Sequence, residues 1–367
     1  MHVLFVFNHP APYKVRLFNE LSRTIKVTAL FERLKNRDRN SHFYDNNEIN
    51  FETVHIRGID LGKENHFSSG IVKHLKSHRY DLVIMNGWHT FSEMMALDYL
   101  KKHRKPYVFY INGGLIKENE TTLKRRIKRH YISGASWYFS PDENSNRYLI
   151  YYGTEANKIV NYPYSTIYQN EILSSSLSRQ EKDILRSKLN LHHERIFVSC
   201  GQFIPRKNYE RLISYWRNRP DNELLLIIGG GPQKRKYQNL IARYSLKNVK
   251  LIDFVPREQL FSYFQAADGY LFPSKEDIYG HVINEALSQG LPVISNQHVN
   301  SALRLIKDEK NGYVIDFADD TQIDMAIEGL ARNGDMTSEA LKTARENTIE
   351  IMAAAHLKAF NDWTTKE

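Results

Sequence analysis

Short apolar runs alternate with amphipathic segments along the first half of the chain. The apolar runs have the length of strands and predict them at residues 2–7, 25–31, 81–85, 107–111 and 137–139. The segments between them have one apolar face and predict helices, for example at residues 15–23, 71–77 and 90–103. Buried strands separated by helices are typical of a parallel sheet that is covered on both faces.

The second half repeats this alternation. Its strands are predicted at residues 196–200, 223–228, 249–252, 269–272, 292–295 and 312–314, and its helices at 209–217, 233–244, 257–266, 281–289, 321–332 and 337–363. Pro and Ser gather at residues 161–165 and 174–178, which indicates a junction, and a new helix is expected near Ser178. The predicted fold class is therefore α/β, with two Rossmann-like, doubly wound parallel-sheet domains that face a cleft, at residues 1–168 and 169–349.

Length and composition agree with two buried cores. The chain has 367 residues, 41% of them hydrophobic and 25% charged, which is typical of folded domains. No apolar run reaches the about 20 residues of a membrane-spanning helix, and the short apolar start predicts a buried strand rather than a signal peptide. Cys200 is the only cysteine, so no disulfide framework is expected. We expect a cytoplasmic protein in which Cys200 is a small buried side chain.

The net charge of +9 lies entirely in the first half. Residues 1–165 hold 25 Lys and Arg against 16 Asp and Glu, whereas residues 166–367 hold 26 of each kind. Part of this excess lies on a predicted helix whose other face is apolar, formed by Leu123, Ile127 and Tyr131. Either this helix packs on its sheet and is solvated outside, or it binds an anionic membrane surface or lipid phosphate through Lys124, Arg125, Arg126, Lys128 and Arg129.

The most informative segment is residues 272–294. A strand ends there, a loop holds Glu276 and Asp277, Gly280 permits a close backbone approach, and Glu285 follows within the next helix. A helix start suits a diphosphate, and two carboxylates suit the hydroxyls of a ribose and of a second sugar. The alternative is that Asp277 only caps the helix and Glu285 is only solvated. Nucleotide-sugar binding is favoured for two reasons. Glu285 has apolar neighbours in its helix, and the Gly280 turn has no evident role unless a ligand binds there.

This segment resembles the E-x7-E signature of family 4 retaining glycosyltransferases, with Asp277 at the first acidic position and Glu285 at the second. The resemblance implies that Glu285 binds the donor ribose and that Asp277, or Glu276 in its place, contacts the donor sugar. It also implies that backbone amides of Tyr279, Gly280, His281 and Val282 bind phosphate and sugar. The substitution of Asp for Glu departs from the family pattern.

A second loop, residues 201–208, resembles the basic loop of the same family. Arg206 and Lys207 match the later basic position and would neutralise the diphosphate, whereas Gln202 stands where the family has an Arg and Asn208 where it has a Gly. Gly201 begins this loop. Further donor contacts are implied at the glycine turn that includes Gly230, which is equally explained as a flexible turn, and near the nucleobase at Phe254 and Val255.

The first half offers candidates for the acceptor side. Residues 8–16 resemble a subgroup loop with two prolines. Other predicted strand ends carry residues 86–89 and 112–114. The family often has a His near the donor sugar at the last of these, and the chain lacks it, which leaves the sugar open. The acceptor-side candidates are His9, Pro12, Tyr13, Trp88, His89, Asn112 and Gly113.

The resemblance implies a GT-B fold whose C-terminal helix, about residues 350–367, packs back on the first domain through Phe360 and Trp363. It implies a nucleoside-diphosphate donor, for which UDP-sugars are favoured, transfer with retention, no metal and no other cofactor. The sequence agrees, since it shows no Asp-x-Asp at a strand end and no His/Cys ligand set. The expected acceptor is a hydroxyl of a saccharide or lipid-linked saccharide in surface polysaccharide biosynthesis, at the inner face of the membrane.

Two other functions remain as alternatives. A nucleotide-sugar epimerase of similar architecture would need an acid/base set that the sequence does not display. A nucleic-acid-binding protein would account for the basic half and the many tyrosines, but the second half is neutral and no nucleic-acid-binding motif appears.

Overall fold

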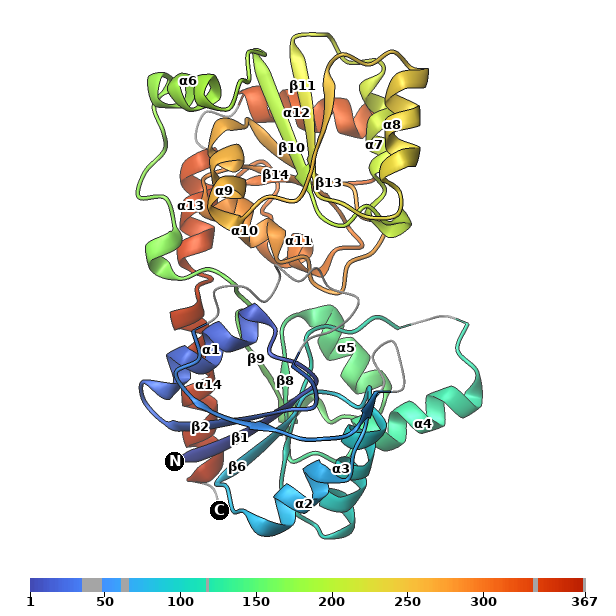
Figure 1. Ribbon diagram of the computed structural model, residues 1–367, viewed down its shortest axis with the longest axis vertical. Coiled ribbons are helices and arrows are strands. Elements are labelled where there is room, and N and C mark those ends of the chain that lie inside the picture. Colours follow the sequence, from blue (N-terminus) through green and yellow to red (C-terminus); the bar gives the residue numbers. More distant parts are fainter. Residues whose placement is uncertain (35–47, 61–65, 117–118, 333–335, 366–367) are drawn as a thin grey trace. The chain divides into compact units, whose positions relative to one another are not determined.

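The computed structural model describes residues 1–34, 48–60, 66–116, 119–332 and 336–365. The chain forms two compact units. The first comprises residues 1–166 together with 349–367, and the second comprises residues 167–348. The boundaries expected from the sequence were 168/169 and 349/350. Each unit is built on its own parallel sheet, which confirms the α/β, doubly wound fold class (Figure 1).

The N-terminal unit contains a seven-stranded parallel sheet in the order β3-β2-β1-β6-β7-β8-β9. Its strands are β1 (His2–Phe7), β2 (Lys26–Phe31), β3 (Glu52–His55), β6 (Leu82–Met85), β7 (Val108–Tyr110), β8 (Trp137–Ser140) and β9 (Ile159–Asn161). A separate short hairpin joins β4 (Ile59–Asp60) to β5 (His66–Phe67). The helices are α1 (Pro12–Ser22), α2 (Gly70–Ser77), α3 (Phe91–Lys102), α4 (Thr122–Ile132), α5 (Glu143–Tyr151) and α14 (Ile349–Thr364).

Alternation along β1 explains how both faces of this sheet are covered. Leu4 and Val6 belong to the buried cluster formed with α2 and α3. Phe5 points to the other face, where its ring lies 4.4 Å from that of Phe18 on α1 and 6.3 Å from that of Phe360 on α14. A strand that is buried on both faces needs an unbroken apolar run, which is what the sequence of β1 supplies.

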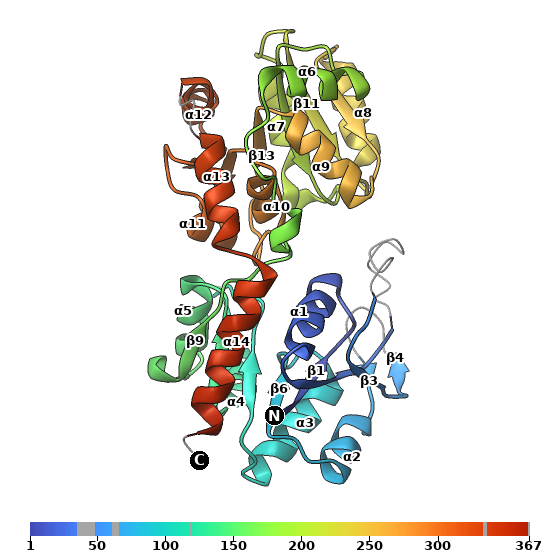
Figure 2. The ribbon, with the colours of Figure 1, turned by 90° about the vertical axis from the view of Figure 1, so that its left-hand side faces the viewer.

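Helix α14 comes from the far end of the chain and lies beside α1 on this face (Figure 2). Its Trp363 ring is stacked on Trp137 of β8, with ring centres 5.2 Å apart. The prediction of one helix over residues 337–363 is wrong. Two helices, α13 (Met336–Arg345) and α14, are separated at residues 346–348. The break is stabilised by a side chain elsewhere in the fold, because Asn284 Nδ2 donates a hydrogen bond to Asn347 O at 2.9 Å.

The C-terminal unit contains a six-stranded parallel sheet in the order β12-β11-β10-β13-β14-β15. Its strands are β10 (Arg195–Cys200), β11 (Glu223–Ile228), β12 (Val249–Ile252), β13 (Gly269–Phe272), β14 (Val293–Asn296) and β15 (Gly312–Ile315). The helices are α6 (Arg179–Lys188), α7 (Tyr209–Trp216), α8 (Lys234–Arg243), α9 (Arg257–Ala266), α10 (Val282–Ser288), α11 (Asn300–Leu305), α12 (Asp320–Arg332) and α13.

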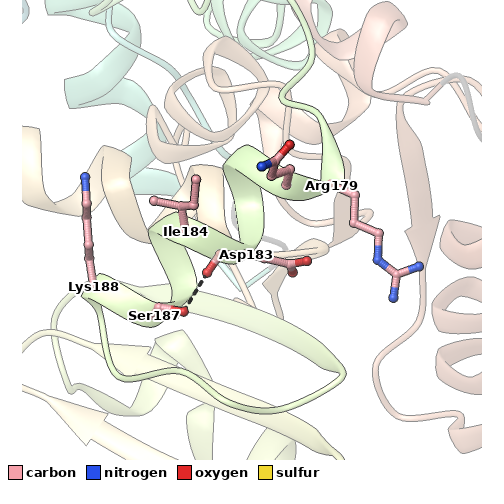
Figure 3. Close-up of a pocket in the computed structure, with 6 residues that line it drawn as sticks. Arg179, Asp183, Ile184, Ser187 and Lys188 are labelled. Atoms are coloured by element: carbon pink, nitrogen blue, oxygen red, sulfur yellow. Dashed lines mark hydrogen bonds between the residues drawn. The ribbon is translucent and has the colours of Figure 1, made fainter.

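Helix α6 begins at the predicted place. The Ser178 hydroxyl accepts a hydrogen bond from Glu181 N, and the Glu181 carboxylate accepts one from Ser178 N at 2.8 Å, which is a capping box. A surface hollow runs along this helix, and Figure 3 shows its lining side chains. They are Arg179, Gln180, Asp183, Ile184, Ser187 and Lys188, and none of them is a residue that the sequence singled out for function.

Candidate functional site

Strand order places one site in the C-terminal unit. From β10 the chain runs outward through β11 and β12, then returns to the other side of β10 and continues through β13, β14 and β15. The strand order therefore reverses between β10 and β13. Ligands of open α/β sheets bind at the carboxyl ends of strands at such a switch point. The loops that leave β10 and β13 there are the two loops that the sequence singled out.

These loops bring Arg206, Lys207 and Asp277 together. Asp277 Oδ2 accepts hydrogen bonds from Lys207 Nζ at 2.6 Å and from Arg206 Nη1 at 2.9 Å. The two backbones also meet, since Lys275 N donates to Arg206 O at 2.8 Å. The three side chains are therefore held as one charged cluster at the carboxyl edge of the sheet.

Burial and charge act against each other in this cluster. Lys207 is buried, and burial lowers the pKa of its ammonium group even though Asp277 beside it favours the charged form. Burial tends to raise the pKa of Asp277, but the charges and hydrogen bonds of Lys207 and Arg206 outweigh burial and lower this pKa below its usual value. The cluster is therefore an ion pair at neutral pH, with two cations for one carboxylate.

The local backbone explains how a lysine comes to lie here. Asn208, at the family's Gly position, has a left-handed conformation with φ of 61°, and its Nδ2 donates to Pro273 O at 3.2 Å. This turn directs Lys207 inward, where its Nζ lies 4.4 Å from the centre of the Phe272 ring. Gly201 has φ of 143°, and a Cβ there would lie 2.9 Å from the Tyr209 hydroxyl. Gln202 is exposed on the same loop.

Gly280 forms the turn before α10. Its φ is 92°, and a Cβ there would lie 3.0 Å from both Ser301 Oγ and Val299 Cγ1. Ser301 in turn donates to Gly280 O at 2.9 Å. Tyr279 is buried, the His281 ring lies 5.0 Å from the Tyr279 ring, and Val282 is the first residue of α10. The glycine is thus required by the packing of its own loop, whether or not a ligand binds there.

Glu285 lies on α10, and its carboxylate is partly exposed. Glu285 Oε1 is 3.9 Å from Arg257 Nη2, and the same Arg257 Nη2 is 3.7 Å from Glu171 Oε2. Arg257 was not among the residues that the sequence motifs singled out. The signal available was its position just after the end of β12, two residues beyond Val255.

The glycine turn after β11 contains both strained and open positions. Gly229 has φ of 148°, and a Cβ there would lie 2.0 Å from Gly201 O, so the two loops are in backbone contact. A Cβ on Gly230 would meet no atom within 4 Å.

Phe254, after β12, is half exposed and Val255 is partly buried. Glu276 is exposed beside Asp277, and its backbone O accepts from Arg206 Nη1 at 3.3 Å.

In the N-terminal unit the structure links several acceptor-side candidates. Asn112 Nδ2 donates to Asn86 Oδ1 at 3.2 Å, and the Tyr164 hydroxyl donates to Asn112 Oδ1 at 3.1 Å. The Tyr13 and Tyr164 rings are 5.8 Å apart. These contacts connect the start of α1 with the segments after β6, β7 and β9 at the carboxyl edge of the sheet. The acceptor candidates nearest these contacts in sequence are His9, Pro12, which begins α1, and Gly113, which has φ of 144°.

The loop with Trp88 and His89 is held by α3. Glu93 accepts hydrogen bonds from His89 N at 2.7 Å and from Thr90 N at 3.2 Å, which fixes the backbone of this loop. The Trp88 ring is stacked on Tyr131 of α4, with ring centres 5.8 Å apart and planes 5° apart, while His89 is exposed. Such a platform of aromatic rings suits the apolar face of a sugar.

Lys14 and Glu32 are buried ionisable residues of this unit that were not identified from the sequence. Lys14 is buried with its Nζ 3.9 Å from the centre of the Tyr110 ring, and no described residue hydrogen-bonds that Nζ. Burial holds the pKa of Lys14 well below its usual value. Glu32, after β2, accepts a hydrogen bond from the Thr90 hydroxyl at 2.7 Å and lies 3.1 Å from His66 Nδ1. Burial raises the pKa of Glu32 to about 7.

The basic helix α4 is more exposed than packing on its sheet would require. Leu123 is 69% exposed and Ile127 is 39% exposed, and of the eleven residues of α4 only Ile132 is buried. Lys128 Nζ is paired with Glu120 Oε1 at 2.5 Å. Exposed cations flank the two apolar side chains, namely Lys124, Arg125, Arg126 and Arg129.

The described residues contain neither a metal-binding cluster nor a helix that could span a membrane. Among residues 1–34, 48–60, 66–116, 119–332 and 336–365, no three His, Cys, Asp or Glu side chains are placed to hold a metal ion together. Within the same ranges, no helix combines the length and the apolar character needed to cross a bilayer.

Comparisons with known proteins connect this site to a family. A family model described as "Glycosyl transferases group 1" matches residues 181–348. The amylovoran biosynthesis glycosyltransferase AmsD of Erwinia amylovora is 24% identical over 166 residues, which are 45% of this chain and 46% of that protein. The O-antigen biosynthesis glycosyltransferase WclY of Escherichia coli is 22% identical over 297 residues, which are 77% of this chain and 79% of that protein.

The crystal structure of Anabaena Alr3699/HepE in complex with UDP superposes with a TM-score of 0.78 and 17% identity. The superposition covers 99% of this chain and 100% of the HepE chain. This likeness shows the fold, which is GT-B. The chain spans half or less of the length of the first curated relatives that it matches, between 35% and 49%.

Proposed function

We propose, from the premise that the C-terminal unit of this chain belongs to the group 1 glycosyl transferases, that the protein transfers a sugar from a nucleoside diphosphate to an acceptor hydroxyl. The observation that carries the proposal is the pair of cations, Lys207 and Arg206, at the switch point of the C-terminal sheet. A departing diphosphate gains negative charge in the transition state, and cations already in place stabilise that charge.

Each acidic residue has a proposed role at this edge of the sheet. Glu285 accepts two hydrogen bonds from the ribose hydroxyls of the donor, since it lies on α10 with its carboxylate partly exposed. Asp277, or Glu276 in its place, contacts the donor sugar; the two are adjacent in the loop after β13. Phe254 is half exposed at the end of β12 and contacts the nucleobase. The loop around Gly280, with Tyr279, His281 and Val282, contributes backbone amides to the phosphates and sugar.

The proposed transfer proceeds with retention. The bond from the anomeric carbon to the diphosphate oxygen breaks, and the acceptor oxygen bonds to the same face of that carbon. The acceptor proton passes to the departing diphosphate. Lys207 and Arg206 supply the charge stabilisation, and no metal takes part in this scheme. Positioning and preorganised charge then account for the acceleration.

The favoured donor is a UDP-sugar, and the favoured pathway is surface polysaccharide biosynthesis. The solved structure of HepE contains UDP, and AmsD and WclY are named for amylovoran and O-antigen biosynthesis. The acceptor is a saccharide or a lipid-linked saccharide. It binds at the carboxyl edge of the N-terminal sheet, where Trp88 offers a stacking surface and Asn112 a polar one.

We also propose that helix α4 binds an anionic membrane surface. Leu123 and Ile127 are exposed and would enter the lipid headgroup region, while Lys124, Arg125, Arg126 and Arg129 meet the lipid phosphates. Each cation near such a surface contributes about 1 kcal/mol. Lys128 contributes less, because Glu120 already neutralises it.

Calorimetry tests the donor site directly. UDP, GDP and ADP are titrated into the protein in the presence of EDTA, with Glu285→Gln as the site variant and Glu194→Gln as its control. Glu194 is exposed before β10, at the opposite edge of the sheet. We expect one nucleotide to bind without metal, binding to weaken at least about tenfold in Glu285→Gln, which is about 1.4 kcal/mol, and the control to be unchanged. No binding of any nucleotide by folded protein would refute the proposal.

A further inference from the structure

One carboxylate oxygen holds both of the cations assigned to the donor diphosphate. Asp277 Oδ2 is 2.6 Å from Lys207 Nζ and 2.9 Å from Arg206 Nη1. The Lys207 and Asp277 side chains are only 10% and 14% exposed, so water has little access to the contact between them. The position between the two cations is therefore already occupied by an anion that belongs to the protein.

The backbone on both sides fixes Asp277 in this place. Asp277 N donates to His298 O at 3.1 Å, and Asp277 pairs with Val299 as an isolated parallel bridge. On the other side, the Ser274 hydroxyl donates to Arg206 O at 3.2 Å and to Glu276 O at 2.9 Å. The loop after β13 thus presents the carboxylate to the two cations by its own geometry, and no ligand is needed to form the contact.

In the proposed function, the donor diphosphate binds the same two side chains. Lys207 has three N–H groups and Arg206 has five, and Lys207 Nζ and Arg206 Nη1 each already donate to Asp277 Oδ2. Burying the charge of a lysine without an anion beside it raises the free energy of the folded state. This explains why Lys207 pairs with Asp277 when no donor is bound.

We infer that Asp277 acts as an internal substitute for the donor diphosphate, held between Lys207 and Arg206 until the donor displaces it. This inference rests on the proposed function and adds a role for Asp277 as a positioning residue. Asp277 keeps both cations in place before the donor binds, and on displacement it turns its carboxylate toward the donor sugar. When the nucleoside diphosphate remains after transfer, the return of Asp277 to the cations favours its release.

The test measures binding of inorganic pyrophosphate by calorimetry, in EDTA and at low ionic strength. The variant Asp277→Asn removes the competing charge. Asp316→Asn makes the same charge change at the same edge of the sheet, where Asp316 follows β15 and accepts from Ala318 N at 2.8 Å. We expect Asp277→Asn to bind pyrophosphate about tenfold more tightly than the wild type, and Asp316→Asn to change affinity less than twofold.

An ion pair that only supports the loop predicts the opposite result. Loss of Asp277 would then disorder the cations, and pyrophosphate would bind more weakly or as before. Unchanged or weaker binding by Asp277→Asn therefore overturns the inference. An equal gain in Asp316→Asn also overturns it, because the effect would then be one of net charge alone.

Folding of the variant supplies a second measurement. Removal of Asp277 leaves Lys207 buried without its anion, so thermal unfolding of Asp277→Asn, and of Asp277→Ser as a second variant, should occur at lower temperature. Pyrophosphate should restore the midpoint of both variants more than it raises that of the wild type. Failure of pyrophosphate to stabilise either variant overturns the inference. Absence of nucleotide binding by the wild type would refute the proposed function alone, since pyrophosphate reports the anion site without the nucleoside.

Discussion

Replacing His356 tests how the aromatic face of the N-terminal unit is held together. His356 lies on α14, fully buried, with its ring 4.4 Å from Phe139 and 4.9 Å from Tyr162. Its Nδ1 donates to Met352 O at 2.7 Å, whereas no described residue hydrogen-bonds the buried Nε2, so a second proton on the ring would have no partner. Burial lowers the pKa of His356 from 6.5 to about 3, although the hydrogen bond to Met352 opposes this shift.

The sign of the pH dependence follows from this lowered pKa. Above pH 6.5 the ring is neutral in both the folded and the unfolded chain, so His356 contributes no pH dependence. Between pH 6.5 and pH 3 the unfolded chain binds a proton that the folded chain excludes. The free energy of unfolding should therefore fall by about 1.4 kcal/mol for each pH unit, or about 5 kcal/mol over the whole interval. Such a loss is comparable with the total stability of many domains.

Urea unfolding at pH 7.0, 6.0 and 5.0 measures this effect. The chain has four tryptophans, and a Trp216→Phe background leaves Trp88, Trp137 and Trp363, all in the N-terminal unit, as fluorescent probes. His356→Phe keeps an aromatic ring but cannot titrate, and His103→Gln replaces an exposed histidine as the control. We expect the decrease below pH 6.5 to be much smaller in His356→Phe than in the control. Parallel decreases in both would show that His356 does not cause it.

Three further substitutions or probes have defined outcomes. Gly280→Ala places a Cβ at φ of 92°, against Ser301 and Val299, and should lower the free energy of unfolding by about 1–3 kcal/mol in chemical denaturation, where no change would contradict the tight turn. Lys14→Met should stabilise the chain at pH 7. That gain should shrink as the pH rises toward 10.5, because the unfolded lysine then also loses its proton, and parallel thermal midpoints of the two proteins at pH 7–9 would refute the reasoning. Burial raises the pKa of Cys200 to about 12, so a thiol reagent at pH 8 should label it only in denaturant, and rapid labelling of the native protein would contradict its burial.

The sequence predicted every inner strand of the two sheets and the edge strands β12 and β15, but it missed the edge strands β3 and β9, for a physical reason. Strands β1, β11 and β13 are buried on both faces, so each is a continuous apolar run whose ends are visible in the sequence. Strands β3 and β9 were missed because they lie at the sheet edges, are short and are partly exposed, which leaves no apolar run. The break between α13 and α14 was missed because residues 346–348 include neither Gly nor Pro.

The contacts within the charged cluster could not be predicted from the sequence, for a different reason. The sequence singled out Lys207 and Asp277 separately, each by its position after a strand and by its resemblance to a family motif. Their direct contact joins residues 70 positions apart and depends on β10 and β13 being neighbours. Arg257 and Lys14 carry no motif, and their importance appears only when their distances to Glu285 and to the Tyr110 ring are known.

The N-terminal unit begins to be synthesised first, but it is complete only when α14, at the end of the chain, has been made. A ribosome makes β1 and β8 early, but the helix that covers Phe5, Trp137 and Phe139 emerges only after residues 167–348 have been made. At about 5–20 residues per second, that interval is about 10–40 s. During this time an aromatic face of the nascent chain is uncovered and available to chaperones, and a tag or truncation that disturbs α14 would prolong its exposure.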